Sequence, residues 1–314
     1  MKKIYEFLLW NNCNNNCTFC HQRLHERKNT DKILTKEEQI KSLQLCKTFL
    51  QTTFEKGNHI LLCGGEIFDV TDTWVKLHVN SLLSQVIDHM LADEIELLYL
   101  NTNLLYENLE LLEGFLENIK QNNLFERLRF TTSYDIEGRF NKSSELLFYK
   151  NLKYLTDTFA DIRVVVNTIL TKEACLRIRE DRFGADFLLE YLEEQDKTKY
   201  TMKDWSDYFR VQINTIPYIQ LKSDTAPAAP TKNEALATLL HLDTVMPGYL
   251  KWYAENIGLT QEKLLYEYNK ANNEFVFCSS EIAECGHSVN FQLSFADSTD
   301  CFPCEVQKLL KYNK

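Results

Sequence analysis

The sequence predicts an α/β protein, namely a partial (βα)6 parallel barrel followed by a small C-terminal helical and metal-binding lobe. Short apolar runs alternate with stretches of helical periodicity six times in residues 1–222. This alternation is typical of a parallel sheet built by right-handed crossovers. Residues 223–232 contain prolines and no apolar periodicity, which predicts a linker. Residues 233–314 then form the C-terminal lobe, with further helical patterns and four clustered cysteines.

Hydrophobic periodicity places the individual elements. The expected strands are residues 3–10, 59–63, 95–101, 128–134, 162–170 and 209–219. The expected helices of the barrel are residues 35–57, 70–91, a leucine-rich helix that ends at 119, 143–156, and one that contains 187–194. After the linker, helices are expected at residues 234–240, 249–256 and 260–272. Thr35 and Glu38 form a capping box that opens the first helix, and Cys46 falls on its apolar face as a core thiol.

The charge balance excludes some partners. The chain has 35 Lys and Arg against 45 Asp and Glu, a formal net charge of −10. This charge argues against non-specific binding to nucleic acid or to an anionic membrane. Near the N-terminus only Phe7 to Trp10 form an unbroken apolar run, which is too short for a signal peptide or a membrane span. We therefore expect a cytoplasmic protein.

Three of the ten cysteines follow the first expected strand as Cys13, Cys17 and Cys20. In a reducing compartment, clustered thiols favour metal ligation over disulfides. Three thiolates on one short loop match three corners of a [4Fe-4S] cluster and leave the fourth iron open, which indicates catalysis. The alternative is a zinc knuckle completed by His21 or His25.

Residues 13–20, CNNNCTFC, resemble the C-x3-C-x-aromatic-C signature of the radical S-adenosylmethionine (radical SAM) superfamily, with Phe19 in the aromatic position. The resemblance covers about residues 1–220 in layout and does not specify the substrate. It implies that S-adenosylmethionine chelates the open iron and is reductively cleaved to a 5′-deoxyadenosyl radical, which abstracts hydrogen from the substrate. The protein contributes binding and orientation. A flavodoxin- or ferredoxin-type protein would supply the electron.

Gly64, Gly65 and Glu66 follow the second expected strand and resemble the GGE element of the family, which holds the methionine amino group. Glycines permit close backbone approach to a ligand, and Glu66 offers a carboxylate to an ammonium group. Without its position behind the cysteine triplet, the tripeptide would be interpreted as a turn.

Later strand ends supply further candidates for binding S-adenosylmethionine. Thr102 and Asn103 follow the third strand, Ser133 ends the fourth, and Asn167 lies in the fifth. Ser133 is the preferred ribose contact, and Arg139 can pair with the methionine carboxylate as a guanidinium fork. Ordinary strand-end capping is the alternative for each residue. The glycine-rich fifth-strand motif of the family is absent, so no adenine contact is assigned.

Four further cysteines lie within 27 positions near the C-terminus: Cys278, Cys285, Cys301 and Cys304. Four soft ligands match either a structural zinc site or a fully ligated auxiliary [4Fe-4S] cluster, and both alternatives remain open. His287 enters only as a substitute ligand, and four unliganded thiols are the remaining alternative.

These observations favour a radical SAM enzyme that acts on a peptide or protein side chain. A small-molecule substrate, and specifically a nucleotide or nucleobase, is the alternative within the superfamily. A non-catalytic module that binds zinc at both ends for recognition is the alternative from another class.

Cys63 ends a strand beside the expected active site, and a buried strand residue is the favoured interpretation of its pattern.

Overall fold

The computed structural model describes residues 3–10, 12–15, 17, 34–184, 200–217, 228–257, 263–269 and 274–279. Several expectations concern residues that lie outside this part of the chain. These are the helix at 187–194, the first half of the linker (residues 223–227), and the residues Phe19, Cys20, His21, His25, Cys285, His287, Cys301 and Cys304. Cys278 lies in a described strand, but only its backbone is described.

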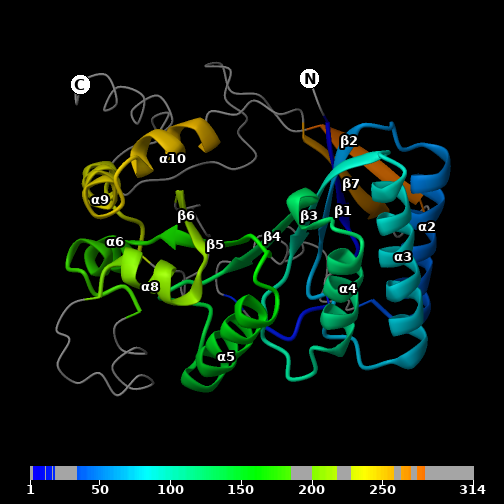
Figure 1. The fold of residues 1–314 in the computed structure, drawn as a ribbon, viewed down its shortest axis with the longest axis horizontal. Helices are drawn as coiled ribbons and strands as arrows, with labels where there is room; N and C mark the ends of the chain where they lie inside the picture. Colours follow the sequence, from blue (N-terminus) through cyan, green and yellow to red (C-terminus); the bar gives the residue numbers. More distant parts are fainter. Residues whose placement is uncertain are drawn as a thin grey trace.

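The described strands form one sheet in the order β6-β5-β4-β3-β2-β1-β7-β8 (Figure 1). Their bounds are β1 (Ile4–Leu8), β2 (Asn58–Cys63), β3 (Ile95–Asn101), β4 (Leu128–Ser133), β5 (Val164–Leu170), β6 (Gln212–Pro217), β7 (Lys263–Asn269) and β8 (Glu274–Ser279). Strands β1 to β6 are all parallel and follow chain order. The expected parallel α/β architecture is therefore confirmed, and its strand order is compatible with a partial barrel.

Helices connect the parallel strands. Their bounds are α2 (Lys36–Thr52), α3 (Thr73–Leu91), α4 (Glu110–Gln121), the 3-10 helix η1 (Phe125–Arg127), α5 (Lys142–Thr158), α6 (Lys172–Arg179), α8 (Met202–Phe209), α9 (Lys232–Val245) and α10 (Tyr249–Ile257). Right-handed crossovers that advance in one direction place their helices on the same face of a sheet. Figure 1 shows α2, α3 and α4 side by side along the strands, with α9 and α10 near β6.

The two faces of the sheet differ in burial. Side chains in β4 and β5 alternate between buried and half-exposed, with Phe130 and Val166 fully buried on the side of the helices. A parallel sheet covered on both faces would instead be apolar throughout. The half-exposed face carries Thr131, Ser133 and Asn167. Polar side chains therefore lie on the face opposite the helices, beside the apolar Val165 and Ile169.

Local sequence signals account for several helix ends. Thr35 and Glu38 form the predicted capping box at the start of α2, with Thr35 N–H donating to Glu38 Oε2 over 2.8 Å. Cys46 is fully buried on this helix, as predicted, and burial raises the pKa of its thiol far above the usual value. Helix α3 begins at Thr73 rather than at residue 70, because Asp72 accepts the N–H groups of Trp74 and Val75.

The predicted helix at residues 260–272 is wrong. Residues Lys263–Asn269 form β7, which pairs in parallel with β1, and Glu274–Ser279 form the antiparallel strand β8. The free edge of β1 offers backbone hydrogen bonds that a local helical pattern does not reveal. Part of the expected helical lobe therefore extends the main sheet, whereas the division at residues 223–232 stays a prediction.

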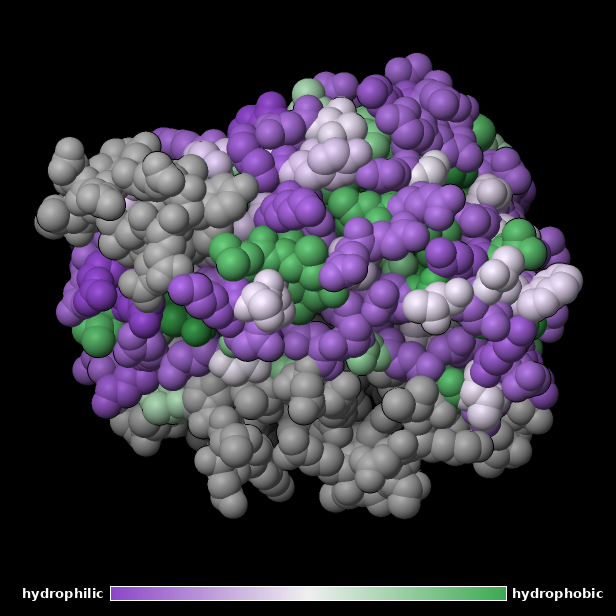
Figure 2. Space-filling view, turned by 90° about the horizontal axis from the view of Figure 1, so that it is seen from below, coloured by the Kyte–Doolittle hydropathy of each residue, from purple (hydrophilic) through white to green (hydrophobic). Residues whose placement is uncertain are grey.

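None of the helices in the described part of the chain is both apolar and long enough to cross a membrane. Figure 2 shows the face seen from below in Figure 1, where hydrophilic residues predominate and the hydrophobic residues form small separate patches.

Candidate functional site

The carboxyl ends of β1, β2 and β3 bring the first two predicted motifs together. Gly65 N–H donates to Trp10 O over 2.6 Å, and Glu66 N–H donates to Asn12 O over 2.8 Å. The segment after β2 is therefore bonded directly to the segment that leads to Cys13. In parallel barrels, reactive groups lie at this edge of the sheet. The predicted meeting of the cysteine loop and the Gly64–Glu66 segment is confirmed.

Gly64 allows the two segments to approach closely. Its φ is +153°, and a Cβ atom added at this position would lie 2.8 Å from Trp10 O. Side chains rarely tolerate either condition. The close approach that requires Gly64 is thus one between two parts of the chain, whereas the approach predicted from the sequence was to a ligand.

Cys13 and Cys17 both receive N–H donors. Asn15 donates its backbone N–H to Cys13 Sγ over 3.4 Å and its side-chain amide to Cys17 Sγ over 3.3 Å. Asn103 Nδ2 donates to Cys13 Sγ over 3.5 Å. Both cysteines are half-exposed. Hydrogen bonds to sulfur stabilise the anionic thiolate that ligates a metal, so the donor set fits an iron-sulfur cluster.

Glu66 links the ends of β2 and β3. Its side chain is buried, with Oε1 accepting Phe68 N–H over 3.0 Å and Oε2 accepting Thr102 Oγ1 and Asn103 N–H over 2.9 and 2.7 Å. Burial raises the pKa of the Glu66 carboxyl to about 7, although these three donors lower it. The carboxyl therefore titrates near neutral pH, where a small change in its surroundings alters its charge.

Thr102 and Asn103 were predicted to contact the cofactor, and both are buried beside Glu66. The structure shows them holding Glu66, and Asn103 also contacts the cysteine loop. Asn14 and Asn15 were not predicted as site residues. The signal was the run of asparagines between Cys13 and Cys17, whose short side chains bear both donors and acceptors. Asn14 Oδ1 accepts Asn103 Nδ2 over 2.7 Å.

Ser133 and Asn167 are partners in the β4–β5 register and lie on the polar face of the sheet. Asn214 of β6 is the partner of Asn167 and donates Nδ2 to Asn167 Oδ1 over 2.9 Å. Asn214 was not predicted, because it is identified only by the register between β5 and β6. The three residues form a polar row across neighbouring strands.

Arg139 forms an ion pair within the chain. Its Nε donates to Asp135 Oδ2 over 2.6 Å, and Asp135 Oδ1 accepts Ile169 N–H over 2.8 Å. The Asp135 side chain is 1% exposed. The structure thus gives Arg139 a buried partner that the sequence analysis did not assign, and a contact with the methionine carboxylate stays a prediction.

Cys63 is buried, as predicted for a strand residue. Its thiol donates to Glu6 Oε1 over 3.4 Å and to Phe7 O over 3.6 Å. The side chain thus lies between β2 and β1, next to the Gly64–Glu66 segment.

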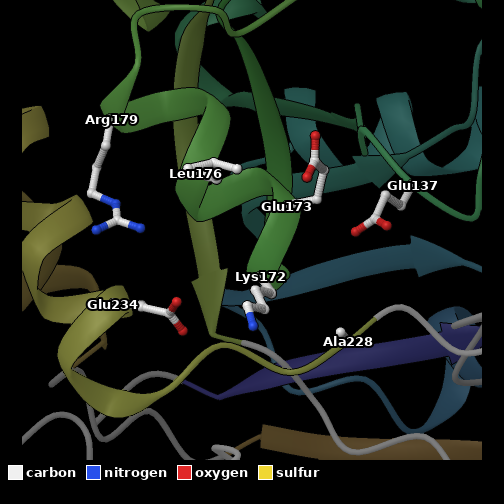
Figure 3. A pocket seen from close by; sticks show the side chains of 7 residues that line it. All are labelled: Glu137, Lys172, Glu173, Leu176, Arg179, Ala228 and Glu234. Carbon is white, nitrogen blue, oxygen red and sulfur yellow. The ribbon is translucent and has the colours of Figure 1, made fainter.

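A cavity of about 230 Å³ opens beyond the carboxyl ends of β4 and β5 (Figure 3). It is lined by Glu137, Lys172, Glu173, Leu176, Arg179, Ala228 and Glu234. Thr171 donates to Glu137 over 2.8 Å, and Arg177 pairs with Glu173 over 2.8 Å. Hydrogen bonds from Thr231, together with the charges of Lys172 and Arg179, hold the pKa of Glu234 below its usual value. The cavity therefore presents charges of both signs.

Comparison of the chain with protein-family models and with curated proteins returned no match. Within the residues that the structure describes, no three His, Cys, Asp or Glu side chains lie close enough together to hold a metal ion. Cys20, the third predicted ligand of the first site, lies outside those residues.

Proposed function

We propose that the protein is a radical SAM enzyme whose [4Fe-4S] cluster is held by Cys13, Cys17 and Cys20. The observation that carries the proposal is the pair of cysteines that receive N–H donors from Asn15 and Asn103 at the carboxyl edge of a parallel sheet. The spacing of the three cysteines and the neighbouring Gly64–Glu66 segment support it further.

When bound, the cluster and S-adenosylmethionine supply a 5′-deoxyadenosyl radical that abstracts hydrogen from the substrate. The residues of this chain bind and orient these groups. Glu66 Oε1 accepts one hydrogen bond within the chain and retains acceptor capacity for the methionine amino group. Ser133 and Asn167, on the polar face of the sheet, are the proposed ribose contacts. Phe19 takes the aromatic position of the motif.

A peptide or protein is the proposed substrate. The cavity beyond β4 and β5 contains three glutamates, Glu137, Glu173 and Glu234, against the cations Lys172 and Arg179. This excess of carboxylates, like the net charge of −10, disfavours the phosphates of a nucleotide. A peptide carries amino, carboxylate and amide groups that match both signs of charge in the cavity.

A second metal centre at Cys278, Cys285, Cys301 and Cys304 forms part of the proposal, either as zinc or as an auxiliary [4Fe-4S] cluster. A flavodoxin- or ferredoxin-type protein is the proposed electron donor, and the cytoplasm the proposed location.

Metal analysis of anaerobically purified full-length protein separates the two classes of function. An enzyme of the proposed kind is brown and contains at least about four irons per chain. A colourless protein with about two zinc ions per chain would instead identify the recognition module. The substrate class is tested by adding a peptide library or a mixture of nucleotides to the reduced enzyme with S-adenosylmethionine. Hydrogen abstraction from a nucleotide alone would overturn the peptide assignment.

A further inference from the structure

Asn103 lies where the cysteine loop, Glu66 and the end of β3 meet. Its backbone N–H donates to Glu66 Oε2 over 2.7 Å, and its Nδ2 donates to Cys13 Sγ over 3.5 Å. The same Nδ2 donates to Asn14 Oδ1 over 2.7 Å. Asn103 lies 90 residues after Cys13 in the sequence, yet its side chain reaches the sulfur because β1, β2 and β3 are adjacent. Asn103 therefore bonds to both predicted motifs.

The backbone around Asn103 fixes the direction of its amide. Asn103 Oδ1 accepts Leu105 N–H over 2.8 Å, which leaves Nδ2 directed at the cysteine loop. Leu104 is buried with φ at +58°, an unfavourable conformation for a leucine. Asn151 of α5 holds this turn by donating Nδ2 to Leu104 O over 2.9 Å and to Tyr106 O over 2.8 Å. A strained turn that the surroundings hold in place is characteristic of functional sites.

A hydrogen bond to a ligating sulfur changes the reduction potential of a metal centre. The reduced form of an iron-sulfur cluster carries one more negative charge than the oxidised form. An N–H dipole directed at the sulfur stabilises the reduced form more, which raises the reduction potential. Because Asn103 is 8% exposed, water does not replace its amide freely.

We propose that Asn103 is a positioning residue that raises the reduction potential of the metal centre at Cys13 and joins that centre to Glu66. The inference rests on the proposed function and deepens it, because it assigns a control of electron transfer that the cysteine motif does not contain. Asn15 belongs to the cysteine loop itself. Asn103 follows β3 and therefore donates to the sulfur of Cys13 from outside the cysteine loop.

The test is a redox titration of the reconstituted full-length protein without S-adenosylmethionine, followed by the electron paramagnetic resonance signal of the reduced cluster. Asn103→Leu removes the donor to Cys13 Sγ. Asn103→Asp keeps the acceptor for Leu105 N–H but places an anionic oxygen beside the sulfur. Thr102→Val is the matched control, since Thr102 is also buried and donates to Glu66 Oε2 without a bond to Cys13.

At a fixed solution potential, Asn103→Leu should lower the ratio of reduced to oxidised cluster about tenfold, equal to about 59 mV for one electron. Asn103→Asp should lower this ratio further, and Thr102→Val should leave it within about twofold at equal iron content. Unchanged potentials in both Asn103 variants, or an equal shift in Thr102→Val, would overturn the role of Asn103 but leave the proposed function standing. Wild-type protein that assembles no iron-sulfur cluster would overturn the proposed function as well.

Discussion

Because Glu66 is proposed to bind the methionine amino group, we expect the affinity for S-adenosylmethionine to depend on the charge of its carboxyl and therefore on pH. Burial raises its pKa to about 7, so the free protein holds a mixture of the charged and neutral forms at neutral pH. A methionine amino group that donates to Glu66 favours the charged carboxylate. Binding therefore releases a proton from Glu66, and the affinity rises as the pH rises through 7.

The pKa fixes the size of this effect. With a pKa of about 7, roughly a tenth of Glu66 is ionised at pH 6 and roughly nine tenths at pH 8. The dissociation constant should thus fall by almost tenfold between these values, equal to about 1.3 kcal/mol. The α-amino group of the ligand also titrates near pH 8. The contribution of the ligand is the same in a Glu66→Gln variant, so it cancels in the ratio of the dissociation constants of the two proteins.

Calorimetric titration with S-adenosylmethionine at pH 6, 7 and 8 measures the ratio of the dissociation constants of wild-type protein and Glu66→Gln. Parallel titrations in buffers with different ionisation enthalpies should show about half a proton released by Glu66 at pH 7. Glu66→Gln loses this release, and its affinity should follow only the ligand. Identical pH profiles for the two proteins would refute the contact between Glu66 and the amino group.

Three further predictions concern Glu66, Gly64 and the C-terminal cysteines. The folded-state pKa of Glu66 lies above its usual value, so its contribution to stability is present below pH 4.5 and is lost as the pH rises through 7. Denaturant unfolding should therefore show that wild type loses about 2.5 kcal/mol relative to Glu66→Gln between pH 5 and 8. Gly64→Ala should lower the free energy of unfolding by about 2 kcal/mol or more in thermal unfolding, because its Cβ meets Trp10 O. Gly114→Ala in α4, which has open space around it, should instead raise the free energy of unfolding by about 1 kcal/mol. Replacing any one of Cys278, Cys285, Cys301 and Cys304 by Ala should release the same metal, measured by elemental analysis, and unequal losses would contradict a single site.

Local signals in the sequence were sufficient for most of the fold. The Thr35 capping box and the alternation of strand and helix periods depend on residues close together in the chain, and both were predicted. Strand β7 was not predicted, because Leu264, Leu265 and Tyr268 also fit one face of a helix. Its extended conformation depends on pairing with β1, more than 250 residues away, which no local pattern encodes.

The candidate site could also be predicted only in part from local sequence patterns. The spacing of Cys13 and Cys17 and the Gly64–Glu66 tripeptide could be recognised in the sequence. The partners of their side chains could not, since two of the three donors to Glu66 come from the residues that follow β3. Arg139 is an exception, because its partner Asp135 lies only four residues before it in the sequence.

The most direct test of the central claim is the formation of 5′-deoxyadenosine by anaerobically reconstituted protein with dithionite and S-adenosylmethionine. The wild-type protein should contain the iron of a [4Fe-4S] cluster at Cys13, Cys17 and Cys20, and should produce 5′-deoxyadenosine and methionine in equal amounts. The variant in which all three cysteines are replaced by Ala should lose about four irons per chain and all of this product. Continued 5′-deoxyadenosine formation by that variant, or none by the iron-loaded wild type, would contradict the assignment.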